Sequence, residues 1–299
     1  MTAARRRTVA EGPGEPQESD GMLRIACASA AGLSFLVLGL IVAFMVAESV
    51  PVWREIGLTR MLTDPDWHPT SGTFGLGPMI AGSVSISVAA VAVAAPIGLG
   101  AVLWARYYGP WWLGWCVRGS AELLAGIPSV VFGLWGLTVV VPQIARHRPP
   151  GLGVASAAIV LALMVIPTAV VLLDAAVAEL PGEWRSAAAA AGMGRRRWIW
   201  HVVLPAVRPR LILAVILQTA RGLGETIAVL MVCGNVVQWP TSPFVPVRTL
   251  TTTVALEMPY AMGTHRAALF ACGVILLAVV EGLLGVGWAV QRVRATDGS

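Results

Sequence analysis

Six apolar stretches, each about long enough to cross a lipid bilayer, divide this sequence of 299 residues. A helix that spans the hydrocarbon core needs about 20 mostly apolar residues. The composition agrees, because 57% of the residues are hydrophobic and only 12% are charged, whereas a soluble domain carries about 25% charged residues. The sequence therefore predicts an all-α membrane protein with six transmembrane helices, at Ile25–Ala47, Pro78–Trp104, Ala121–Val141, Val154–Leu173, Leu211–Val232 and Ala267–Val290.

The distribution of arginine predicts how these helices are oriented. All 21 basic residues are arginines, and the cytoplasmic loops of membrane proteins are enriched in basic residues. With the N-terminus inside, 14 arginines lie in cytoplasmic segments and six lie outside, so both termini are expected in the cytoplasm. The expected divisions are a disordered cytoplasmic tail at 1–22, the first transmembrane helix at 23–47, an extracytoplasmic loop at 48–76, a core with five transmembrane helices at 77–293 and a cytoplasmic tail at 294–299.

The absence of lysine limits the chemistry of the chain. A Walker A phosphate loop requires its lysine, so the chain is not expected to hydrolyse nucleotides, and its energy must come from a partner or a gradient. The four cysteines have no short spacing, and in apolar segments a thiol behaves as a small hydrophobe. We therefore expect membrane lipid around the chain and no disulfide, metal site, cofactor or nucleic-acid partner.

A charged pair, Arg221 and Glu225, lies within the fifth apolar stretch, and Thr226 comes directly after it. A charge at membrane depth is costly, so such residues are usually paired and often mark a path for ions or substrates. Residues four apart on a helix share one face. Two hypotheses remain open: Arg221 offers a transient site to an oxyanion and Glu225 tempers its field, or the two form a structural ion pair that locks the helix bundle.

The loop between the fourth and fifth stretches, at 180–210, is the longest basic segment. Alanines from Ala187 onward favour a helix, and Gly192 is a residue typical of helix ends. Such a helix either belongs to an anchor on anionic lipid or inserts into the groove of a partner.

Several short motifs in this loop and in the fifth stretch resemble those of a known family. Ala187 and Ala188, then Gly192, then Leu204 and Pro205, match the cytoplasmic "EAA" loop of ABC-transporter permeases, with Ser186 in place of the usual glutamate. The segment Ala220–Asn235 resembles the signature of phosphate permeases, and the residues after its Arg and Gly-Glu-Thr are most similar to the PstC-type subunit. Matches at Glu122–Gly136 and Phe74–Ser83 extend the resemblance, which covers about Trp67 to the C-terminus.

The resemblance implies a fold, an activity and partners. The fold is a type I ABC importer permease (MetI-like) bundle in a bacterial plasma membrane, with a cytoplasmic coupling helix. The activity is phosphate import driven by ATP, with the chain as a transport subunit and not as an enzyme. The partners are a homologous PstA-type permease, a cytoplasmic PstB-type ATPase dimer and an extracytoplasmic PstS-type phosphate-binding protein. The implied path residues are Arg221, Glu225 and Thr226, and the implied coupling residues are Ser186, Ala187, Ala188, Gly192, Leu204 and Pro205.

Three alternatives to a phosphate permease stay open at this point. In the first, the chain is a permease of the same kind whose cargo is another oxyanion, such as sulfate or molybdate. In the second, it is a membrane scaffold that senses phosphate. An intramembrane enzyme acting on lipid phosphates is disfavoured, because the histidines at positions 68, 147, 201 and 265 are scattered.

Overall fold

A computed structural model describes residues 18–297, and their secondary structure is almost entirely helical. The chain separates into two compact units, Met1–Ala47 and Glu48–Ser299. Most of the tail predicted at 1–22 lies outside the described residues. In chain order the elements are α1 (Glu18–Glu55), α2 (Leu58–Thr63), β1 (Trp67–His68), η1 (Pro69–Ser71), β2 (Thr73–Phe74), α3 (Gly77–Tyr107), α4 (Trp111–Ala125), α5 (Ser129–Trp135), η2 (Gly136–Val140), α6 (Val141–Ala145), α7 (Val154–Ala178), α8 (Gly182–Ala190), α9 (Arg195–Trp198), η3 (Ile199–Val203), α10 (Leu204–Leu223), α11 (Ile227–Val232), α12 (Leu250–Glu257), η4 (Met258–Tyr260) and α13 (Gly263–Asp297).

Among the described residues, five helices are long and apolar enough to cross a membrane, and a bent helix pair brings the number to six. The five are Gly21–Glu55, Gly77–Tyr107, Val154–Ala178, Arg195–Leu223 and Gly263–Ala289. This agrees with the predicted all-α membrane fold. The spans are longer than predicted, because the helices continue past the apolar stretches that mark them in the sequence.

The third predicted helix is not a single straight span. The chain bends by 94° between α4 and the helical segment Ser129–Ala145. The break contains Gly126 and Pro128, and Pro128 has extended backbone angles (φ −60°, ψ 142°). Proline lacks an N–H and disfavours helical geometry in the residue before it, which accounts for the position of the break.

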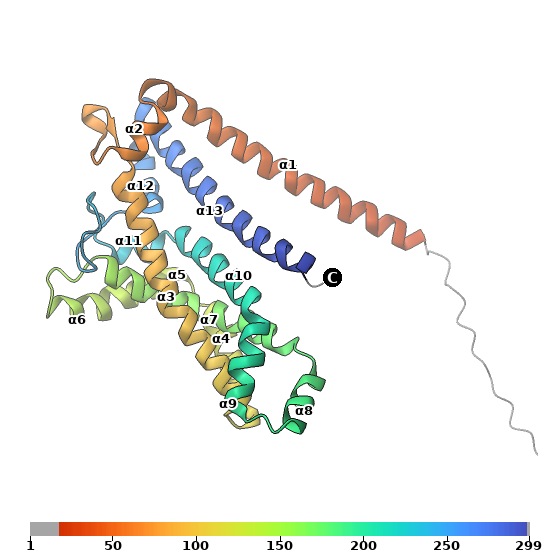
Figure 1. Cartoon of the computed structure of the whole chain (residues 1–299). Coiled ribbons are helices and arrows are strands. Elements are labelled where there is room, and N and C mark those ends of the chain that lie inside the picture. The colour runs from red at the N-terminus through yellow and green to blue at the C-terminus, as the bar shows by residue number, and fades with distance from the viewer. Residues whose placement is uncertain (1–17, 298–299) are drawn as a thin grey trace, which may run out of the picture. The chain divides into compact units, whose positions relative to one another are not determined.

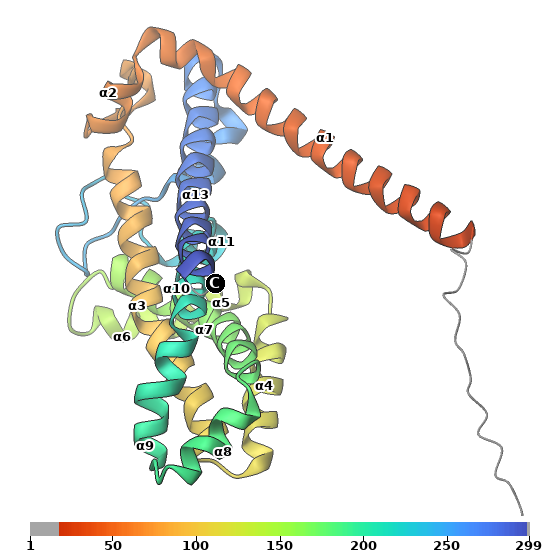
Figure 2. The ribbon, with the colours of Figure 1, turned by 45° about the vertical axis from the view of Figure 1, so that its right-hand side comes forward.

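The larger unit, Glu48–Ser299, is built around α3, α7 and α10. Figures 1 and 2 show α8 and α9 at one end of this unit and α2 at the other, with α3 running between the two ends. Small residues allow close helix packing: a Cβ atom on Gly98 of α3 would lie 2.8 Å from the Cβ atom of Ala169 on α7. Much of the remaining helix surface is apolar and exposed, as expected for a chain surrounded by lipid and other membrane helices.

The fifth predicted helix, Leu211–Val232, differs from the structure at both ends. It begins earlier, because α9, η3 and α10 are continuous from Arg195, and the whole run Arg195–Leu223 is long and apolar enough to cross a membrane. It also ends earlier, because α10 stops at Leu223 and α11 starts at Ile227. The segment η3 is a π-helix that directly precedes Leu204 and Pro205. A proline removes one helical hydrogen bond, and a π-bulge accommodates that loss.

The end of the larger unit that contains α2 has a small core of its own. The strands β1 and β2 pair antiparallel, with Trp67 opposite Phe74, and these two rings pack edge to face with centroids 5.4 Å apart. Both side chains are buried with residues of α2, α12 and α13, including Met61, Leu250 and Leu269. This core fixes α12 against the start of α13.

Candidate functional site

Arg221 lies in the last turn of α10 and its side chain is exposed in the single chain. The next residues, Gly222 and Leu223, are buried. A Cβ atom on Gly222 would lie 3.3 Å from a Leu161 methyl carbon and 3.4 Å from the Ser87 Cβ atom, so glycine lets this end of α10 approach α7 and α3. The close packing fixes the backbone at this point and leaves the Arg221 guanidinium outside the core.

Glu225 and Thr226 lie in the break between α10 and α11 and are half-buried. The Ala228 N–H donates to Glu225 Oε1 at 3.4 Å, and the Thr226 hydroxyl donates to the Gly224 carbonyl at 3.4 Å. Glycines at 222 and 224 weaken the helix here, which accounts for the break. Through its bond to the Ala228 N–H, the Glu225 carboxylate contacts the first turn of α11.

The expectation that Arg221 and Glu225 share one helical face is wrong, because α10 ends between them. Among the side chains that the structure describes, those of residues 21–289, neither Arg221 nor Glu225 has an ion-pair partner. The structure brings the two residues to the same break, but it does not bring their charges together. Arg221 is left as an exposed cation beside an interruption in a spanning helix.

The N-terminal end of α12 forms hydrogen bonds to the break between α10 and α11 and to α3. The buried Thr251 hydroxyl donates to the Glu225 carbonyl at 3.1 Å, and the Leu250 N–H donates to the Ser83 hydroxyl of α3 at 3.0 Å. Thr249 caps α12, because its side chain accepts from the Thr252 N–H and the Thr252 hydroxyl accepts from the Thr249 N–H. Thr251 thus satisfies a carbonyl that the interrupted helix leaves without a helical partner.

Replacing Thr251 by valine is expected to lower the transport rate several-fold, because the break at Glu225 loses its hydrogen bond to α12. The free energy of unfolding is expected to fall by only about 1 kcal/mol. Uptake assays and thermal unfolding of the purified protein measure both effects. Thr251→Ser should retain the rate. Thr253→Val is the matched control, since that buried hydroxyl bonds instead to the Thr249 carbonyl at 2.8 Å; an equal loss of rate in this control would contradict a specific role for Thr251.

Glu257 and three partners, Trp67, Arg248 and His265, form a largely buried polar cluster, which we call the Glu257 cluster. Arg248 Nη1 lies 2.6 Å from Glu257 Oε1, while the Trp67 indole N–H and His265 Nε2 lie 2.9 and 2.8 Å from Oε2. Burial raises the pKa of the Glu257 carboxyl, but hydrogen bonds from His265 and Trp67 and the nearby Arg248 charge outweigh burial, so this pKa lies below its ordinary value. The cluster ties the C-terminal end of α12 to β1 and α13.

Sequence reasoning missed the Glu257 cluster, because Trp67 and Glu257 are 190 residues apart. The local signal that could have found it was the presence of opposite charges, Arg248 and Glu257, within one short segment. Across the described residues, no three histidine, cysteine or carboxylate side chains gather closely enough to hold a metal ion.

The predicted coupling residues are divided between α8 and the start of α10. Ser186 and Ala187 are exposed on α8, while Ala188 is half-buried against the core that contains Trp198. The helix ends in a Schellman motif: Gly192 has a positive φ of 68°, its N–H donates to the Ala189 carbonyl at 3.0 Å, and the Met193 N–H donates to the Ala188 carbonyl at 2.9 Å. Leu204 and Pro205 begin α10 after the π segment.

Ion pairs join the C-terminal end of α7, the end that leads into α8, to neighbouring helices. The Asp174 carboxylate lies 2.5 Å from Arg106 Nε and 3.6 Å from Arg118 Nη1. Five residues further along the chain, Glu179 pairs with Arg210 of α10. These pairs join α3, α4, α7 and α10 at the end of the molecule that presents α8 (Figure 1).

Comparisons with known proteins agree with this architecture. The chain is 35% identical over 254 residues to the probable ABC transporter permease protein YqgH of Bacillus subtilis (strain 168), covering 79% of this chain and 82% of the relative. It is 29% identical over 306 residues to the phosphate transport system permease protein PstC of Mesorhizobium japonicum, covering 94% of this chain and 93% of the relative.

Solved structures show the same fold. A chain of the MetNI methionine ABC transporter, in inward-facing conformations, superimposes with a TM-score of 0.58 at 17% identity, covering 76% of this chain and 99% of that chain. The fold predicted from the sequence, a MetI-like importer permease bundle, is therefore confirmed. Residues 94–286 match the family described as binding-protein-dependent transport system inner membrane component, and together with the YqgH relative this match establishes that the chain belongs to that family.

Proposed function

We propose that this chain is the membrane-spanning permease subunit of an ATP-driven importer of inorganic phosphate. Relatives named phosphate transport system permease protein PstC, at 28–33% identity over most of the chain, support phosphate as the cargo. The observation that carries the proposal is the exposed Arg221 guanidinium at the break between α10 and α11.

Arg221 suits a transient oxyanion site on physical grounds. A guanidinium offers several N–H donors in a planar fork that matches phosphate. Arg221 has no ion-pair partner among the described residues, so its full charge is available to a passing anion. Glu225, held at α11, and Thr226 lie on the same break and contribute a nearby negative charge and a hydroxyl. Conduction requires weak binding, and the Glu225 carboxylate weakens the field that the anion experiences.

The helix α8 supplies the coupling to ATP hydrolysis in this proposal. Its exposed, alanine-rich surface at Ser186 and Ala187 presents little side-chain bulk to a partner groove, a mode of recognition in which a helix lies in a groove. Its inner face, at Ala188, packs on the membrane bundle. In this proposal, motion of α8 reaches α10 through the core that Ala188 and Leu204 both pack against, and Pro205 follows directly after Leu204.

Membership of the family implies that the chain assembles with a second permease and an ATPase. We propose that the second permease is a homologous PstA-type chain, that a PstB-type ATPase dimer binds α8, and that a PstS-type phosphate-binding protein delivers the anion from outside. The proposed location is a bacterial plasma membrane with both termini in the cytoplasm. The proposed segments are the tail at 1–22, the first spanning helix at 23–47, the outer loop at 48–76, the permease core at 77–293 with its loop at 180–210, and the tail at 294–299.

The first experiment is uptake of labelled orthophosphate by phosphate-starved cells with and without this gene, in a strain that lacks other phosphate importers. The proposal expects uptake to require the gene and to be unaffected by excess sulfate or molybdate. Competition by either anion would assign the permease to that other oxyanion. Unchanged uptake in the deletion strain, with loss of the starvation response, would instead favour a membrane scaffold that senses phosphate.

A further inference from the structure

A carboxylate to which the proposed function gives no role lies within the last spanning helix. Glu281 is on α13, in the span Gly263–Ala289, eight residues before the end of that span. Its side chain is exposed, and it forms no ion pair with any side chain of residues 21–289. A charge at membrane depth almost always faces the interior of a helix bundle or a water-filled cavity, and it often marks a substrate path.

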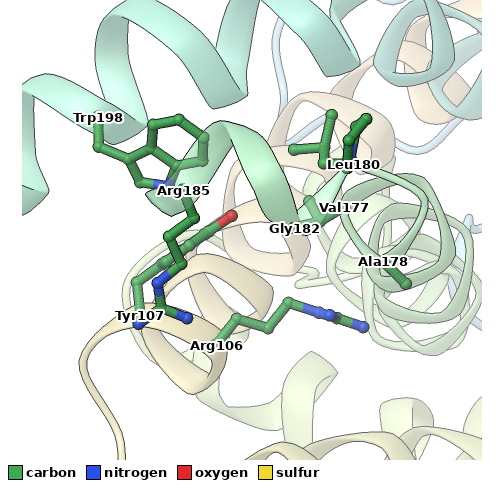
Figure 3. Close-up of a pocket in the computed structure, with 9 residues that line it drawn as sticks. Arg106, Tyr107, Val177, Ala178, Leu180, Gly182, Arg185 and Trp198 are labelled. Carbon is green, nitrogen blue, oxygen red and sulfur yellow. The ribbon is translucent and has the colours of Figure 1, made fainter. Parts of the chain in front are cut away.

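Charges at the ends of helices need no such explanation, because water reaches them. Arg106 and Arg185, for example, lie around an open pocket where α8 meets the ends of α3 and α7 (Figure 3). Glu281 differs from them, since about 12 Å of helix separates it from the end of its span. Its charge therefore requires an aqueous path or a partner of opposite charge.

The packing of α13 on α10 places Glu281 level with Arg221. A Cβ atom on Gly287 of α13 would lie 3.4 Å from Ile216 and 3.5 Å from Leu213 of α10. The two helices run in opposite directions, because α10 starts at the end that carries α8 and α13 starts at the end that carries α2 (Figures 1 and 2). Arg221 comes five residues after Ile216, and Glu281 comes six residues before Gly287. At about 1.5 Å per residue, both residues lie about 8 to 9 Å from this contact, in the same direction along the helices.

The two residues also lie on the same side of the helix pair. Each is turned by about a third of a turn from the contact between α10 and α13, and in antiparallel helices these two turns lead to the same side. Leu217, one turn before Arg221, and Gly285, one turn after Glu281, are exposed as well. This side is therefore left uncovered by the rest of the described chain, and it carries two opposite charges at one depth.

We propose that Glu281 is a further residue of the anion path and an exchangeable counterion for Arg221. The identity of the anion as phosphate rests on the proposed function. When the path is empty, the Glu281 carboxylate turns to the guanidinium. An arriving oxyanion displaces the carboxylate, and the return of the carboxylate helps to release the anion.

Glu281 suits this exchange better than Glu225 does. The Glu225 carboxylate accepts the Ala228 N–H at 3.4 Å, which directs it to α11, whereas Glu281 is on another helix and forms no ion pair in the described chain. Guanidinium groups bind phosphate oxygens with strong, charge-assisted hydrogen bonds, but conduction requires weak binding. A carboxylate that competes for Arg221 reduces the fraction of complexes ready to bind and so weakens the apparent affinity.

Cross-linking tests the placement of the two residues directly. In the Arg221→Cys/Glu281→Cys double variant, a short bifunctional thiol reagent should join the two positions in the assembled permease–ATPase complex, as identified by mass spectrometry of the peptides. The matched control combines Arg221→Cys with Val286→Cys, because Val286 is exposed but lies on the other side of the contact with α10. Absence of the first cross-link, or equal yields from the two pairs, would overturn the placement.

Binding of labelled phosphate to the same complex in nanodiscs, without a phosphate-binding protein, tests the exchange. If the carboxylate occupies Arg221 in about nine of ten empty complexes, Glu281→Gln should tighten the apparent affinity about tenfold, equivalent to about 1.4 kcal/mol. Uptake by cells that carry this variant should fall several-fold, because the anion leaves more slowly. In the Arg221→Ala background, Glu281→Gln should have no further effect on binding. Val286→Gln, which places an amide on the other side of α13, should behave as the wild type.

Two results would overturn the counterion role. The first is unchanged or weaker phosphate binding in Glu281→Gln, with the amount of assembled complex intact. The second is a loss of assembled complex when Glu281→Gln is introduced with or without Arg221→Ala, which would assign Glu281 to a contact with the second permease.

The proposed function can fail separately. A wild-type complex that binds sulfate or molybdate and not phosphate, with binding that Glu281→Gln tightens, would refute phosphate as the cargo and leave the role of Glu281 intact. Normal phosphate import by cells carrying Glu281→Gln, at unchanged affinity, would refute the role of Glu281 alone.

Discussion

Replacing Arg221 by alanine is expected to abolish uptake, by at least about a hundredfold, while the protein still folds and assembles. Losing several charge-assisted hydrogen bonds to the transported anion removes roughly 3 kcal/mol or more. Folding is spared because Arg221 is exposed and has no ion pair in the described chain, so its removal strands no buried charge. Initial uptake rates and the amount of assembled importer in the membrane are the two measurements.

The control for this experiment is Arg208→Ala, which removes another exposed arginine of α10 away from the break. It should leave uptake close to that of the wild type. If Arg221→Ala lowered the amount of assembled importer as much as it lowered uptake, the arginine would be a structural lock against another subunit. Glu225→Gln further separates the path hypothesis from the structural-lock hypothesis. In the path hypothesis the variant still assembles but releases the anion more slowly, because the nearby negative charge that weakens anion binding is gone.

Replacing Glu257 by alanine is expected to destabilise the larger unit by about 3–5 kcal/mol, the usual cost of removing one partner from a buried ion pair. Arg248 and His265 would lose their shared acceptor while their side chains remain only 13% and 16% exposed. Loss of folded protein after heating in detergent measures the effect. Glu48→Ala is the control, because it removes an exposed ion pair with Arg266, 3.7 Å apart, and such pairs contribute about 0–1 kcal/mol.

The Glu257 cluster also predicts an acid dependence of stability. The pKa of Glu257 lies below its ordinary value of 4.5 in the folded protein, so the folded state favours the ionised carboxylate. Its contribution is therefore complete above pH 4.5 and is lost as the pH falls through the lowered pKa. The thermal midpoint of the wild type should fall more steeply than that of Glu257→Ala in this acidic range. Parallel curves for the two proteins would contradict this account.

The helix α8 was predictable to within a few residues, because its signals are local. Alanines favour a helix, and only glycine adopts the positive φ of Gly192 without strain. The expected end of the helix at Gly192 is confirmed by the Schellman motif there. Two residues later, Gly194 is the N-cap of the next helix, α9.

By itself, the sequence determined the membrane class, the approximate position of each span and the short helix α8, since apolar length and helix-end residues act over a few turns of chain. Only the tertiary structure decided that the Arg221 and Glu225 charges stay apart and that Glu257 gathers partners from distant segments. The bend at Pro128 lies between these cases: the proline marks a break, but its angle depends on how α5 packs on α11. The physical reason is that a helix is encoded by neighbouring residues, whereas a contact between distant residues depends on which helix surfaces pack together.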